Sequence, residues 1–108
     1  MGIERRRHER IDIALEVRVR HKDNNGALTE ESTLSGNISL SGCSLLIARE
    51  VATGSEVEME FIRRVPGQEE PVSLSFRGTV VRSTRINRAQ YVLGIEFLND
   101  RFPISVLG

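Results

Sequence analysis

The stretch IDIALEVRVR, from Ile11 to Arg20, decides the fold class of this chain. Its apolar side chains fall on every second residue, at Ile11, Ile13, Leu15, Val17 and Val19. Successive side chains of a β-strand point to opposite faces, so this alternation separates the apolar set from the polar set. The stretch therefore predicts a strand with one face in a core and the other in water.

The same alternation returns in further segments, and turn-forming residues separate them. These segments are STLSGNISL (32–40), CSLLIA (43–48), EVEMEFI (56–62), the run from Val72 to Val80, and the run from Tyr91 to Phe97. The pairs Asn25-Gly26 and Pro66-Gly67 are typical of tight turns. No part of this region has the period of a helix. We expect an all-β fold, a six-stranded antiparallel β-barrel, because closure of the sheet removes exposed strand edges.

The alternation also assigns side chains to faces. In STLSGNISL, the residues Leu34, Ile38 and Leu40 share one parity, which we expect to face the core. Asn37 and Ser39 would then project side by side from the outer face of the same strand. Two short hydrogen-bonding side chains would thus be available on the outside of the barrel.

Composition and charge exclude several classes of protein. The 108 residues are enough for one domain, and 15 basic residues balance 15 acidic ones. This balance offers no general attraction for DNA or RNA, so neither is expected as a partner. No apolar run is long enough to span a membrane, and the charged first residues do not resemble a signal peptide, so we expect no membrane insertion and a cytoplasmic location. The single cysteine, Cys43, agrees with a reducing compartment.

The common patterns of catalytic and metal sites are missing from the sequence. His8, His21 and Cys43 are too few and too irregularly spaced for a zinc site. There is no G-x-S-x-G, Walker A or G-x-G-x-x-G pattern. Glu56, Glu58 and Glu60 alternate with apolar residues and are expected on a solvated face. We predict that the protein is not an enzyme.

Two short motifs stand out instead. The segment RRRHERID (5–12) precedes the first strand and contains Arg6-x-x-x-Arg10. All basic residues except Lys22 are arginines, and a guanidinium can bond a phosphate or a guanine edge in a bidentate way. The second motif is Asn37-x-Ser39-x-x-Gly42, in which the glycine allows a positive φ or a close approach of two backbones.

Together, these motifs and the late strand VLGIEF (92–97) resemble the PilZ family of cyclic di-GMP receptors. The resemblance implies an N-terminal arm (1–10), a PilZ β-barrel (11–98) and a C-terminal tail (99–108). Family members commonly add a helix after the last strand. Since only about ten residues follow here, we expect little or no C-terminal helix; the tail could equally be a packed arm, a frayed end or the start of a helix.

The resemblance also implies a ligand site and a mode of action. Arg6 and Arg10 would contact a guanine edge and a phosphate, with Arg5 as an auxiliary, while Asn37 and Ser39 would bond the other guanine. Gly42 would shape the turn that follows. Binding would order the N-terminal arm and create a surface for a protein partner, so that a small single-domain adaptor with no other cofactor would respond to cyclic di-GMP.

Other interpretations are open at this point. The chain could be a nucleotide-independent protein-interaction module with a degenerate PilZ site. Binding of single-stranded nucleic acid is a weaker alternative, because Phe61, Phe76, Tyr91 and Phe97 are all expected to face inward. Arg82, Arg85 and Arg88 are expected to form a solvated hairpin end and not a second anion site.

Overall fold

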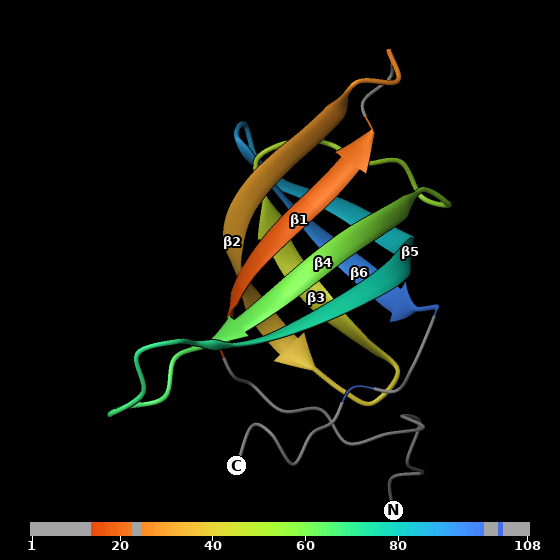
Figure 1. Ribbon diagram of the computed structural model, residues 1–108. Helices are drawn as coiled ribbons and strands as arrows, with labels where there is room; N and C mark the ends of the chain where they lie inside the picture. The colour runs from red at the N-terminus through yellow and green to blue at the C-terminus, as the bar shows by residue number, and fades with distance from the viewer. Residues whose placement is uncertain (1–13, 23–24, 99–101, 103–108) are drawn as a thin grey trace, which may run out of the picture.

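The protein forms a closed antiparallel barrel, as the alternating segments predict (Figure 1). The computed structural model describes residues 14–22, 25–98 and 102. The strands are β1 (Glu16–Lys22), β2 (Leu28–Ile38), β3 (Gly42–Ile47), β4 (Glu56–Arg63), β5 (Val72–Asn87) and β6 (Gln90–Phe97). Their order around the barrel is β1-β2-β3-β6-β5-β4, and β4 closes it by pairing with β1. There is no helix in this part of the chain.

Strand β4 is the clearest case of sequence alternation becoming a two-faced strand. The inward residues are only 1–2% exposed, and they are Val57, Met59 and Phe61. The alternate residues Glu56 and Glu58 are exposed. The pairing of β4 with β1 and with β5 shows no register shift, so the alternation continues across three strands. The inward side chains of all six strands meet in one hydrophobic core.

The start of β2 departs from the predicted parity. Ser35 pairs with Leu45 and Ile38 pairs with Cys43, so three steps along β2 match two steps along β3. Such a β-bulge inserts one residue and exchanges the two faces of the strand. Ile38 is buried as expected, but Leu34 is 57% exposed, and the prediction that it faces the core is wrong.

An aromatic cluster closes one end of the core. Phe61 and Phe76 meet edge to face at 6.1 Å between ring centroids, and Phe97 lies 4.9 Å from Phe76. Phe102 completes the cluster, at 5.0 Å from Phe61, and it is fully buried. Its backbone N–H donates to the Leu40 carbonyl at 3.0 Å. The tail thus contributes at least this one residue to the core, an outcome that the sequence left open.

Candidate functional site

A pocket of about 150 Å³ lies on the outside of the barrel, where β2, β3, β5 and β6 come together. It includes all three residues of the second motif, Asn37, Ser39 and Gly42. The structure therefore brings together the part of the predicted site that it describes. Arg5, Arg6 and Arg10 lie outside the described residues.

The floor of this pocket is hollow because its outward positions carry small residues. Ser44 on β3 pairs with Gly94 on β6, and Gly42 pairs with Glu96. Gly42 has no room for a side chain, since a Cβ there would collide with the Ile95 carbonyl oxygen. Its φ is not positive. Of the two reasons considered for a glycine at this position, close approach of two backbones is the one that applies.

Asn37 offers a free side chain to the pocket. Its contact with Ser44 is made by the backbone N–H, which donates to the Ser44 hydroxyl at 3.1 Å, and not by the side-chain amide. Within residues 14–22, 25–98 and 102, no hydrogen bond occupies that amide. A free amide carries both donors and an acceptor, as a nucleobase edge does.

Ser39 differs from its predicted position. It follows the end of β2 and is only 7% exposed, so it does not project from the outer face beside Asn37. Its hydroxyl accepts from the N–H groups of Ser41 and Gly42 at 3.3 and 3.2 Å and donates to the Gly42 carbonyl at 3.3 Å. The expected orientation is wrong because the strand ends one residue earlier. Ser39 holds the β2–β3 turn together and lines the pocket from within it.

The N-terminal end of β1 lies close to this pocket. The Leu15 N–H donates to the Ser35 hydroxyl, and the Ser35 N–H donates to the Leu15 carbonyl, both at 2.9 Å. Ser35 is two residues before Asn37 in β2. The chain therefore enters the barrel next to the segment that carries the second motif.

Arg82 is a pocket residue that the sequence analysis placed in a solvated hairpin end. It pairs with Gly94 across β5 and β6, directly after a register shift between Val80 and Arg82. A Cβ at Gly94 would lie 3.2 Å from Arg82 Nη2 and 3.5 Å from its Cζ, so the guanidinium lies across the glycine. The sequence offers one indication of this role, namely a glycine at an outward strand position opposite an arginine. The indication becomes visible only when the pairing of β5 with β6 is known.

The thiol of Cys43 borders the pocket but belongs to the core. It is 6% exposed and packs against the Met59 sulfur at 3.9 Å. Burial raises the pKa of Cys43 to about 12, so the thiol is protonated at neutral pH and is a poor nucleophile. Cys43 is therefore a small core residue and not a reactive group of the pocket.

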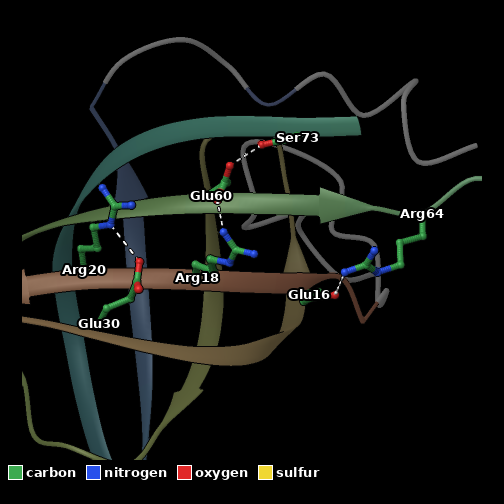
Figure 2. A network of polar contacts seen from close by, with 7 residues as sticks. All are labelled: Glu16, Arg18, Arg20, Glu30, Glu60, Arg64 and Ser73. Carbon is green, nitrogen blue, oxygen red and sulfur yellow. Dashed lines mark hydrogen bonds and ion pairs between the residues drawn. The ribbon is translucent and has the colours of Figure 1, made fainter. Parts of the chain in front are cut away.

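A second pocket, of about 200 Å³, lies on the outer face of β1, β4 and β5. Long charged side chains line it, and they form cross-strand pairs such as Arg18 with Glu60 at 3.4 Å and Arg77 with Glu56 at 3.6 Å. Figure 2 shows part of this network, including Arg20 with Glu30 at 2.9 Å. The Glu30 carboxylate raises the pKa of Arg20 through its hydrogen bond. None of the three described motif residues, Asn37, Ser39 and Gly42, lines this pocket.

Among the described residues, no three His, Cys, Asp or Glu side chains gather as a metal site would require. The described residues also include no helix that is long and apolar enough to cross a membrane.

Solved structures with a similar fold include three bacterial proteins. MotI/DgrA, the inhibitor of motility of Bacillus subtilis, has a TM-score of 0.69 and 23% identity, over 91% of this chain and 44% of that one. The PilZ domain of YcgR from Escherichia coli with c-di-GMP has a TM-score of 0.59 and 18% identity, over 89% and 79%. The MrkH–c-di-GMP complex of K. pneumonia has a TM-score of 0.58 and 15% identity, over 90% and 46%.

Two of these likenesses concern only part of a longer protein, because this chain spans less than half the length of the MotI and MrkH chains. No curated protein sequence matches the chain. The model of the PilZ domain matches residues 4–103, which includes both motifs and all six strands. The chain belongs to the PilZ domain family.

Proposed function

We propose that this chain is a receptor for cyclic di-GMP that binds the dinucleotide at the pocket beside the β2–β3 turn. The observation that carries the proposal is the Asn37 amide, which no other described residue binds, above a floor of small residues in a PilZ domain. The c-di-GMP complexes of YcgR and MrkH, which share the fold, support the choice of ligand. The proposed role is binding and signalling without catalysis.

The arginine motif can reach this pocket. Arg10 is five residues before Leu15, which is bonded to Ser35 at the pocket side of β2. Five residues span at most about 18 Å and nine at most about 32 Å, so Arg10 and Arg6, nine residues before Leu15, lie on a length of chain that can fold back over a ligand held there. In this proposal Arg6 and Arg10 contact a guanine edge and a phosphate, and Arg5 is an auxiliary.

The second motif has divided roles. Asn37 bonds the guanine that faces the pocket, while Gly42 keeps β3 and β6 close together. Ser39 holds the turn with its hydroxyl and contributes to the pocket wall. Ligand binding orders the N-terminal arm and so creates a surface for a protein partner in the cytoplasm of a bacterium.

The test is a calorimetric titration of the purified chain with cyclic di-GMP, with GMP and cyclic di-AMP as controls. We expect saturable binding that is specific to the guanine dinucleotide and is lost in Arg6→Ala and in Arg10→Ala. Asn37→Ala should weaken it by about tenfold, the value of a hydrogen bond to a polar ligand group. Arg20→Ala, on the other outer face, is the matched control and should bind as the wild type does.

Either of two results would contradict the proposal: no heat from a folded wild-type chain, or unchanged affinity in both arginine variants. The first would favour the nucleotide-independent interaction module. Ordering of the arm is checked on the same samples by amide hydrogen exchange. Exchange in residues 2–13 should slow when ligand is added, and an unchanged rate would remove this step from the proposal.

A further inference from the structure

Two charged side chains of the pocket have no part in the function proposed above. They are Arg82 on β5 and Glu96 on β6. Within the described residues neither one is in an ion pair, with each other or with a third group. By contrast, Arg18, Arg20, Arg64 and Arg77 each contact a glutamate.

The two side chains stand on the same outer face and flank a glycine. Arg82 is directly opposite Gly94, and Glu96 is two residues further along β6. Diagonal neighbours of this kind have α-carbons about 7–8 Å apart. Because Gly94 has no side chain, the Arg82 guanidinium lies against the strand there, and a base that enters the pocket can approach it from outside.

The pair has a chemical counterpart in guanine. Guanine presents two acceptors, O6 and N7, on one edge, and two donors, N1–H and the N2 amino group, on the adjacent edge. A guanidinium donates to the first edge and a carboxylate accepts from the second. Adenine has an amino group in place of O6 and lacks the N2 amino group, so it fits neither partner.

We infer that Arg82 and Glu96 form a guanine-reading pair, in which Arg82 donates to O6 and N7 and Glu96 accepts from N1–H and N2–H of the base that enters the pocket. This inference rests on the proposed function, because it concerns the same ligand. It assigns guanine specificity to two residues outside both sequence motifs.

Cyclic di-IMP separates the two contacts, because its hypoxanthine bases keep O6, N7 and N1–H but lack the N2 amino group. The wild type should bind cyclic di-GMP about tenfold more tightly than cyclic di-IMP, as expected for one hydrogen bond to a charged group. Glu96→Gln should lower this ratio, because the neutral amide oxygen of glutamine is a weaker acceptor for the N2 amino group than a carboxylate oxygen. Arg82→Ala should weaken both ligands by about tenfold and leave the ratio unchanged.

The controls are Arg77→Ala, on the same strand as Arg82, and Glu58→Gln, on β4. Both residues line the other pocket, and both variants should keep the wild-type affinity and ratio. A wild type that binds neither dinucleotide would overturn the proposed function and this inference with it. A wild type that binds cyclic di-GMP, with an unchanged ratio in Glu96→Gln or an unchanged affinity in Arg82→Ala, would overturn the pair alone.

Discussion

The two outer faces of this barrel use charge in opposite ways. On β1 and β4 the outward positions carry long side chains of both signs, and cross-strand pairs such as Arg18–Glu60, and Arg77 of β5 with Glu56, join them. On β3 and β6 the outward positions beside the β2–β3 turn carry Ser44, Gly94 and Gly42. Both faces rest on the same hydrophobic core.

This difference shows how a barrel surface acquires a site. Where long opposite charges face each other across strands, the pocket between them is lined by side chains that already contact one another. Where small residues replace them, the surface is hollow and the side chains at its rim, Asn37, Arg82 and Glu96, stay available. The small residues are therefore as much part of the candidate site as the polar ones.

The largest effect is expected from adding a methyl group to the pocket floor. Gly42→Ala places a Cβ against the Ile95 carbonyl oxygen, which belongs to the backbone and cannot turn away. The free energy of unfolding should fall by about 3 kcal/mol, the upper end of the usual cost of overpacking. Chemical denaturation followed by circular dichroism measures it.

Gly94→Ala is the matched control on the neighbouring strand. The atoms nearest to its Cβ would be those of the Arg82 side chain, at 3.2–3.5 Å, and that side chain can move. We expect a loss below about 0.5 kcal/mol. If the free energy of unfolding fell equally in the two variants, the close approach of β3 to β6 at Gly42 would not be what makes this glycine necessary.

A smaller effect tests whether water from the pocket reaches the core at Cys43. Cys43 lies between the pocket residues Gly42 and Ser44 but points inward, and burial raises its pKa from 9.0 to about 12. Below pH 9 the thiol is protonated in both the folded and the unfolded chain. Between pH 9 and about 12 only the unfolded chain loses the proton, so stability should fall by about 1.4 kcal/mol per pH unit from this group.

The measurement is the free energy of unfolding at pH 8, 9 and 10 for the wild type and for Cys43→Ala. The variant should be less stable at pH 8 because it loses packing, but it should lack this part of the decline. Parallel pH profiles would mean that water reaches the thiol through the pocket.

The sequence predicted strands best where their pairing is regular. Alternation in β4 was correct for Val57, Met59 and Phe61, because β4 pairs with both neighbours without a register shift, although Ile62 on the opposite parity is buried as well. In β2 the same reasoning was right for Ile38 and wrong for Leu34, since a bulge lies between them. A bulge depends on the partner strand, and no local pattern in STLSGNISL reveals it.

The candidate site shows the same limit. Asn37 and Gly42 belong to one short motif, so they were predicted together, and they do line one pocket. Arg82 was missed because it reaches the pocket through the register of β5 with β6 and a shift at Val80. Phe102 was missed because one aromatic residue after a strand has no periodicity, although it is fully buried.

The smallest effect is expected on the paired face. Arg18→Ala removes one ion pair, between side chains that are 48% and 35% exposed, and leaves Glu60 with the Ser73 hydroxyl at 2.7 Å (Figure 2). Water screens such a pair, so the free energy of unfolding should fall by less than about 1 kcal/mol. The difference should shrink further when the salt concentration is raised from 0.05 to 0.5 M, values chosen to span about 14 to 4 Å of Debye length.

A double-mutant cycle with Glu60→Gln isolates the pair from the loss of either side chain alone. Because none of the described residues of the proposed site lies on the paired face, affinity for cyclic di-GMP should be unchanged in all three variants. A coupling above about 2 kcal/mol would mean that the paired face is a structural element of the barrel. A change in affinity would mean instead that the two faces are coupled through the core that they share. The distinction between a face of ion pairs and a face with a ligand pocket would then no longer explain how this domain binds its ligand.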